Sequence, residues 1–457
     1  MFDTTTYTAW TLFTDFGIVS ALLLISQLMR AKIKWIQQLF IPPCLLTGFL
    51  GLAFGPNGLG WLPFSSAISV YPAILIAMVF AALAIGMAKS SFSEIKNRVG
   101  GLWVYAQNGL LMQWGLGGLF GFLVLRQIWP DLHPGIGAIL PTGFYGGHGT
   151  AAAVGSGFQG FGWDDATTLG MTIATAGLVA AVLGGLIVIK WATRKKYTQF
   201  IADFKDLPPE LRTGLLPEEK RESMGTATTS SISIESFTFH LALVFVAALG
   251  GYMFSKGMEA LYADLKLPVF SCAFVIGILL KQLMNGMKAT QYICPTTTSR
   301  MGGMFTDFLV AFGIASIKLD VVVQYAMPLI MITIFGMLIV LFTAFYFGHR
   351  ILKTYWCEKT IFCYGWWSGT MATGIALLRI VDPKFQSKTL QDVGIAYLPI
   401  APLEILVITA APIIFSLGWG LWFSLACLAA TFICLYVTRQ VGWWNKGPKQ
   451  KGQPNIA

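Results

Sequence analysis

Runs of roughly 20 apolar residues recur along almost the whole chain, and a run of that length can cross a lipid bilayer as one helix. Hydrophobic residues make up 55% of the 457 positions and charged residues only 11%, so no soluble domain is required. A chain in lipid must satisfy its backbone polar groups within itself, which favours helices. The sequence therefore predicts an all-α polytopic membrane protein. Its helices are expected at about residues 9–29, 39–55, 73–89, 100–125, 167–190, 236–255, 267–285, 302–317, 325–347, 392–415 and 418–438.

The charged residues and cysteines exclude several other classes of protein. The formal net charge is +10, but the basic residues gather in short segments between apolar runs, as orientation signals do, so a nucleic-acid partner is not expected. The first ten residues, MFDTTTYTAW, contain no Lys or Arg, so the first apolar run is expected as a retained helix and not as a secretory signal. The seven cysteines form no CxxC pair, which indicates neither disulfides nor a zinc site.

One apolar segment is interrupted by glycine. Residues 141–157 read PTGFYGGHGTAAAVGSG, and four of the seven residues from 143 to 149 are glycine. Glycine costs a helix roughly 1 kcal/mol per position relative to alanine, so we expect an unwound turn with a short helix on either side. The backbone groups of such a turn need protein or water around them, because lipid offers no hydrogen-bond partner. The segment therefore predicts a binding loop.

The distribution of Lys and Arg predicts the side on which each loop lies. If the N-terminus is outside and residues 134–162 enter and leave from the outer side, 27 of the 31 basic residues lie in the cytoplasm. A full crossing at that segment would place the basic cluster at 190–196 outside, against the positive-inside rule. The same reasoning makes residues 360–378 re-entrant from the cytoplasmic side. We therefore expect the N-terminus outside and the linker and C-terminus in the cytoplasm.

The two halves of the chain also resemble each other in sequence. Three pairs of segments match, around Pro43 and Pro268, around Lys89 and Lys318, and at Gly149-Thr150 and Gly369-Thr370. The two members of each pair are separated by nearly the same length of chain, which indicates one duplicated unit, present in two opposite orientations. Inverted repeats with paired interrupted segments are typical of secondary transporters whose site lies near the bilayer midplane, where the two loop tips meet.

The expected organisation has four parts, divided by a charged and then Ser/Thr-rich stretch that is typical of a solvated linker. The parts are an N-terminal repeat at 1–193 with its re-entrant loop at about 134–162, a cytoplasmic linker at 194–233, a C-terminal repeat at 234–417 with its loop at about 360–378, and an eleventh helix with a basic cytoplasmic tail at 418–457.

In the glycine-interrupted segment and the matching segments of its two halves, the chain resembles a known family, the bacterial sodium:glutamate symporters. This family is related to the 2-hydroxycarboxylate transporters. GGHGT at 146–150, followed by ATAGLVAAVLGGLI from Ala174, resembles the first loop of the family and the helix after it. The second loop keeps only Gly369 and Thr373 of the family's G-A-T-P-T run. The resemblance implies an inner-membrane carrier that couples sodium to glutamate or a similar acidic amino acid, without another cofactor. It also implies a mobile core that contains both loops and moves relative to a dimeric scaffold.

The residues at the two loops supply the expected chemistry. Where each turn rewinds, at Thr150 and Thr370, a short helix is expected to begin with free N–H groups directed at the midplane, which favours a carboxylate. Carbonyl and hydroxyl oxygens beside the turns favour sodium. The candidate substrate-binding residues are Gly146, Gly147, His148, Gly149, Thr150, Ser368, Gly369, Thr370, Thr373 and Arg379, and the candidate sodium ligands are Thr150, Thr370, Thr373 and Glu404.

Several residues have a second interpretation. His148 could bind substrate or brace its loop, and Arg379 could pair with a carboxylate or anchor its helix at the cytoplasmic interface. The glycines could instead serve close helix packing. Glu404 and Asp15 are ionisable groups well within expected helices, which makes them functional candidates, whereas Asp307 is expected near the inner interface.

Other functions are weighed against a carrier of acidic amino acids. A carrier of another di- or hydroxycarboxylate fits the same residues. A channel built on re-entrant half-helices is a further alternative, but the tips GGHGT and SGTMAT are not symmetrical. An intramembrane hydrolase would need His148 and Ser156 to act with the acidic pair at 164–165, which is expected in the outer solvent. We therefore expect a transporter and not an enzyme.

Overall fold

The computed structural model describes residues 8–38, 41–87, 99–200, 210, 213–261, 267–382 and 385–444, and these residues form helices with no strand among them. Eight helices are long and apolar enough to cross a membrane, and two shorter apolar helices accompany them. A helix lies at each of the eleven expected spans, which confirms an all-α polytopic membrane protein. The match at Lys89, part of the linker and most of the tail lie outside the described residues.

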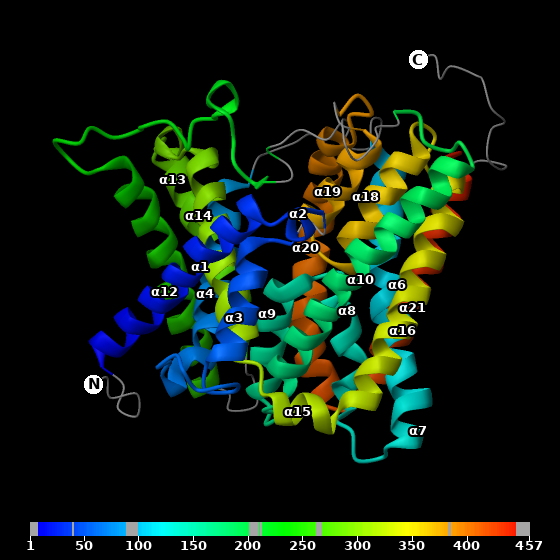
Figure 1. The fold of residues 1–457 in the computed structure, drawn as a ribbon, viewed down its shortest axis with the longest axis horizontal. Helices are drawn as coiled ribbons and strands as arrows, with labels where there is room; N and C mark the ends of the chain where they lie inside the picture. Colours follow the sequence, from blue (N-terminus) through cyan, green and yellow to red (C-terminus); the bar gives the residue numbers. More distant parts are fainter. Residues whose placement is uncertain are drawn as a thin grey trace.

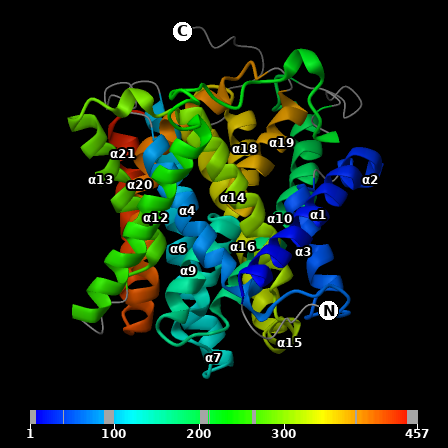
Figure 2. The same ribbon diagram turned by 90° about the vertical axis from the view of Figure 1, so that its left-hand side faces the viewer.

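The helices form two groups that lie side by side (Figure 1). The first, which we call the α4 group, consists of α1 (Ala9–Lys32), α2 (Lys34–Gln38), α3 (Pro43–Phe54), α4 (Tyr71–Gly86), α12 (Ser236–Leu261), α13 (Val269–Gly286) and α14 (Pro295–Ala315). Within it α14 packs along α3 and α4, and α13 packs along α4 and α12. Figure 2 shows this group from its outer side, with helices of the other group behind it.

The second group, which we call the α6 group, contains both interrupted segments. It consists of α6 (Gly100–Phe120), α7 (Arg126–Ile128), α8 (Ile139–Gly143), α9 (Gly147–Gln159), α10 (Ala166–Arg194), α15 (Leu319–Gln324), α16 (Ala326–Phe342), α17 (Gly348–Ile351), α18 (Trp356–Ser368), α19 (Met371–Val381), α20 (Thr389–Ser416) and α21 (Gly420–Gln440). The helix α9 lies between the groups, because it packs against α4 and α14 as well as α10 and α20.

The helix α14 begins about two turns before its expected start at 302. Its first turns carry the polar run TTTSR, which a search for apolar residues passes over. Pro295 at its first position stabilises this start, since proline lacks only an N–H that would have no partner there. As a consequence Asp307 lies in the middle of α14. The expectation that Asp307 lies near the inner interface stays a prediction.

Corresponding elements of the two halves are evenly spaced along the chain. The helix α10 begins at Ala166 and α20 at Thr389, and most other corresponding helix starts are separated by almost the same length of chain. A π-helical turn follows α6 at Gly121–Leu125, and another follows α16 at Thr343–Phe347, again at nearly that separation. Evenly spaced helix starts alone could result from similar loop lengths. Because π-helical turns are rare, their presence at matching positions of both halves is a more specific correspondence.

The first helix of each half is fixed by a buried side chain to the loop before the third helix. In α1 the Asp15 carboxylate accepts hydrogen bonds from the Ser65 backbone N–H at 2.9 Å and from the Tyr71 hydroxyl at 2.8 Å. In α12 the His240 Nε2 accepts one from the Cys294 backbone N–H at 2.7 Å. These contacts stay within the α4 group, so Asp15 braces that group and does not reach the interrupted helices.

Candidate substrate and ion site

Both expected interruptions are present in the helices. The helix α8 ends at Gly143 and α9 begins at Gly147, while α18 ends at Ser368 and α19 begins at Met371. Each interruption therefore joins the carbonyl end of one short helix to the N–H end of the next, and these ends carry opposite partial charges.

The two interruptions are in contact with each other. Gly147 has a φ of +63°, a conformation that residues with a side chain rarely adopt. A Cβ atom at Gly147 would lie 3.0 Å from the Gly369 carbonyl oxygen and 3.4 Å from the Thr370 Cγ2. On the other side, a Cβ at Gly177 of α10 would lie 2.5 Å from the Ser368 carbonyl oxygen. Glycine at 147 and 177 thus allows the backbones to approach this closely.

The expected starting point of the first short helix is wrong by about one turn. Thr370 is the N-cap of α19, as expected, but α9 already begins at Gly147, and Thr150 is its fourth residue. Glycine at 147 and 149 is tolerated because the first turn of a helix makes few backbone hydrogen bonds of its own. Counted from the helix starts, Gly146 corresponds to Thr370. The Gly149-Thr150 pair then corresponds to residues 373–374 and not to Gly369-Thr370.

The hydroxyl groups at the second interruption stabilise their own helices. The Thr370 Oγ1 accepts a hydrogen bond from the Thr373 backbone N–H at 3.2 Å and lies 3.1 Å from the Thr373 Oγ1. The Ser368 hydroxyl donates to the Tyr364 carbonyl oxygen at 2.6 Å. At the first interruption the Thr150 side chain lies directly over Gly146, where it leaves no room for a Cβ atom. These oxygens keep further lone pairs, so the bonds leave them able to bind a cation.

His148 fastens α9 to α10. Its ring is buried, and its Nε2 lies 3.0 Å from the Thr175 Oγ1. The Thr175 hydroxyl donates its only proton to the Met171 carbonyl oxygen at 2.9 Å. His148 must therefore donate through Nε2–H, which fixes the orientation of its ring. This geometry favours the interpretation of His148 as a brace for its loop.

Aromatic rings connect both interruptions to Glu404 in α20. Tyr145, between α8 and α9, lies 5.3 Å from Trp366 of α18, measured between ring centroids. Trp366 lies 5.8 Å from Tyr397 of α20, and the Tyr397 hydroxyl is 3.2 Å from the Glu404 Oε2. The Tyr145 hydroxyl is buried without a partner among the described residues. Sequence reasoning proposed Glu404 but missed both tyrosines, because tyrosine in an apolar segment gives no distinctive signal.

Arg379 does not lie with the other candidates. It is the ninth residue of α19, which places it about 12 Å along the helix from the interruption. Its guanidinium carbon stacks over the Phe385 ring at 4.6 Å from the centroid. The structure therefore favours the interpretation of Arg379 as an anchor at the end of its helix.

Three amide side chains of α6 were missed by the sequence reasoning. Gln107, Asn108 and Gln113 are all buried within an otherwise apolar helix. The Gln113 Nε2 donates to the Trp367 carbonyl oxygen of α18 at 2.9 Å, next to the second interruption. Uncharged polar residues inside an expected membrane span could have identified them, since such groups need a partner in lipid.

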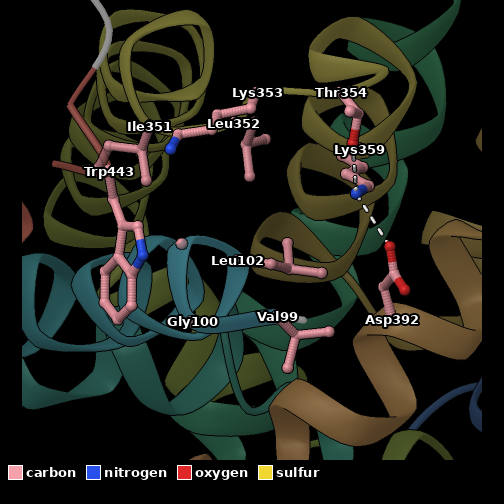
Figure 3. A pocket seen from close by; sticks show the side chains of 11 residues that line it. Val99, Gly100, Leu102, Ile351, Leu352, Lys353, Thr354, Lys359, Asp392 and Trp443 are labelled. Atoms are coloured by element: carbon pink, nitrogen blue, oxygen red, sulfur yellow. Dashed lines mark hydrogen bonds and ion pairs between the residues drawn. The ribbon is translucent and has the colours of Figure 1, made fainter. Parts of the chain in front are cut away.

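A cavity at the far end of α18 is separate from the interruptions. It has a volume of about 140 Å³ and lies between the start of α6, residues 351–354 and Trp443 (Figure 3). Lys359 and Asp392 form an ion pair at 2.9 Å on its wall. Along α18, Lys359 lies about 13 Å before the end of the helix. The cavity is therefore not part of the candidate site.

The sequence model of a family described as sodium/glutamate symporter matches residues 11–385, which include both interruptions. No curated protein sequence matches the chain.

Proposed function

Because the chain belongs to the sodium/glutamate symporter family, we propose that it is a secondary active transporter that couples sodium to the uptake of glutamate or a similar acidic amino acid. The family consists of symporters and not of enzymes. The observation that carries this proposal is the contact between the two helix interruptions, at Gly147 and Gly369. Interrupted helices that meet in this way form the substrate and ion sites of many secondary transporters.

The first turns of α9 and α19 suit an anionic substrate. The backbone N–H groups of Gly147, His148 and Gly149 have no partner within α9, and they lie at the positive end of its dipole. Gly147, the first of them, has no side chain, so a carboxylate can approach the backbone closely there. Thr370 at the start of α19 places its Cγ2 methyl group opposite Gly147, while its hydroxyl caps α19.

The ends of α8 and α18 suit sodium, because their last carbonyl groups lie at negative dipole ends. We propose that the carbonyls at the end of α8 bind sodium together with the hydroxyls of Thr150, Thr370 and Thr373 and with the Glu404 carboxylate. Such a site would supply oxygen ligands only, as hard cations prefer.

We propose an architecture of two inverted five-helix repeats and an additional C-terminal helix, α21. The even spacing of helix starts and the paired π-helical turns support it. In this arrangement the interruption at α8–α9 is re-entrant from outside, and the one at α18–α19 from the cytoplasm of a bacterial cell. The α6 group is the mobile core, and the α4 group is the scaffold of a homodimer in the inner membrane.

A labelling experiment tests the orientation. Ile232, in the linker, is almost fully exposed, and six of the seven native cysteines are buried. We expect a membrane-impermeant maleimide to label Ile232→Cys in inside-out vesicles and not in intact cells, with the wild-type protein as the control. Labelling in intact cells would place the linker outside and overturn the inversion.

A transport experiment tests the function. Purified protein in liposomes should accumulate glutamate or aspartate when an inward sodium gradient is applied, and not when potassium replaces sodium. Uptake of di- or hydroxycarboxylates instead would favour the alternative substrate class. Flux that ignores the gradient and runs at channel rates would contradict a carrier.

A further inference from the structure

The side chain of Gln113 is held in an unusual way. It lies near the middle of the 29-residue span at 100–128 and is 1% exposed. Its Nε2 donates to the Trp367 carbonyl oxygen, while its Oε1 is buried and has no hydrogen-bond partner among the described residues. The amide is thus anchored through nitrogen, and its acceptor oxygen is left free inside the protein.

A free acceptor in such a place requires a ligand. An unpartnered buried polar group costs about 1–3 kcal/mol, and lipid cannot satisfy it. Replacement of the glutamine by an apolar residue would avoid that cost, so the carboxamide needs a reason to be there. An amide oxygen accepts only, so its ligand must be a cation or a hydrogen-bond donor.

The surroundings favour a cation. Trp367 is the second-last residue of α18, so Gln113 reaches the end of that helix where free carbonyls and the negative dipole end lie. The Ser368 carbonyl oxygen belongs to the same end. No Lys or Arg side chain forms an ion pair or hydrogen bond with these residues in the described part of the chain.

The packing between α6 and α18 keeps this arrangement rigid. Gly109, one turn before Gln113, lies directly against the Trp367 ring, which leaves no room for a Cβ atom. On the same side the Tyr105 ring lies 4.8 Å from the Trp367 ring, and its hydroxyl donates to the Ala344 carbonyl oxygen. The next polar residue, Asn108, is fully buried and has no partner for either amide atom among the described residues.

We propose that the Gln113 Oε1, together with the carbonyl oxygens at the end of α18, binds a sodium ion in a site distinct from the Thr150, Thr370 and Glu404 ligands. The assignment rests on the proposed sodium-coupled transport. All its ligands are neutral oxygens, which sodium accepts. Because the site includes the end of α18, an ion there would hold the second interruption in one conformation. Gln113 would then contribute to coupling without contact to the substrate carboxylate.

Sodium binding to the purified protein in the absence of substrate tests this assignment. Gln113→Leu removes both amide atoms. Gln113→Glu keeps an oxygen at the same distance from the backbone. The matched control is Gln127→Leu, on an exposed glutamine of α7 whose hydrogen bond to the Phe122 carbonyl oxygen is long, at 3.5 Å. Radioactive sodium counts the bound ions, and the sodium dependence of glutamate uptake in liposomes gives the cooperativity.

We expect Gln113→Leu to bind one sodium ion fewer, or to bind sodium about tenfold more weakly, as for the loss of one group bonded to an ion. The Hill coefficient of sodium should fall, while the glutamate KM at saturating sodium stays unchanged. Gln113→Glu should still bind the ion, and Gln127→Leu should match the wild type. If Gln113→Leu is not folded, the comparison of Gln113→Glu with Gln113→Met replaces it.

Unchanged sodium stoichiometry and affinity in the folded apolar variant would overturn the assignment and leave water as the ligand. A change in the preference for amino acids over dicarboxylates, with sodium binding unaltered, would also overturn it, since the amide would then bind the ammonium group of the substrate. Sodium binding by a wild-type protein that does not transport acidic amino acids would contradict the proposed function alone.

Discussion

The two helix interruptions reach similar geometries by different chemistry. The first relies on glycine, with Gly147 at a positive φ and no side chain capping α9. The second relies on a side chain, because the Thr370 hydroxyl caps α19 and the residue is extended, with a φ of −145°. Their surroundings differ as well. The helix α9 contacts both helix groups, whereas the main contacts of α18 and α19 stay within the α6 group.

The two interruptions should therefore be sensitive to different substitutions. At the first one the backbone itself is the critical feature, so any added side chain should cause harm. At the second one a polar side chain is critical, so a conservative exchange should preserve function.

Gly147→Ala should abolish uptake. An added Cβ would be forced into a conformation that costs about 1–2 kcal/mol and would lie 3.0 Å from the Gly369 carbonyl oxygen. The folded protein should still appear as a single peak in size-exclusion chromatography, because the turn contributes little helix packing. Wild-type uptake by this variant would show that the close contact of the two interruptions is dispensable.

Thr370→Val should raise the sodium concentration for half-maximal uptake by about tenfold, because it loses both a helix cap and an oxygen ligand. Thr370→Ser keeps the hydroxyl and should remain close to the wild type. Sodium titration of uptake in liposomes measures both. Equal behaviour of the valine and serine variants would remove the Thr370 hydroxyl from the ion site.

Tyr397→Phe should weaken sodium activation by about fivefold, since it removes only one long hydrogen bond to the Glu404 carboxylate. The ring contact with Trp366 is retained in this variant, so protein yield and thermal stability should not change. A stronger effect of Tyr397→Phe than of Glu404→Gln would mean that the tyrosine acts on something other than the carboxylate.

Gly149→Ala should have the smallest effect, less than about twofold on uptake. A Cβ there would lie 3.4 Å from the Ile76 Cδ1, an ordinary van der Waals distance, within a regular helical turn that alanine favours. A loss of uptake as complete as that expected for Gly147→Ala would place the critical backbone at residue 149, next to Thr150, where the sequence predicted the helix to begin.

The sequence was sufficient to predict the helices and the existence of both interruptions. Apolar runs and the cost of glycine in a helix are local properties, so they can be recognised without a structure. The register between the two halves could not be obtained in the same way. The Gly-Thr dipeptides at 149 and 369 look alike, but the first lies inside a helical turn and the second precedes one. Only the positions of the helix starts show that these two dipeptides do not correspond.

The remaining side chains around the interruptions depend on tertiary contacts. Gln113 is bonded to Trp367, in the other half of the chain, and Tyr145 contacts Trp366 across a comparably long separation in sequence. No local pattern connects such residues. Arg379 is the opposite case, because it is close to the loop in sequence but lies about 12 Å along α19 from the interruption.

Protection from labelling tests most directly whether the two interruptions form one site. Gly149→Cys and Thr370→Cys each place a thiol at a partly exposed position, one on each side of the contact. We expect that glutamate and sodium together slow maleimide labelling at both positions, that neither ligand alone does so fully, and that Ile232→Cys is unaffected. Protection at one position only, with full labelling at the other, would contradict the claim of a shared site.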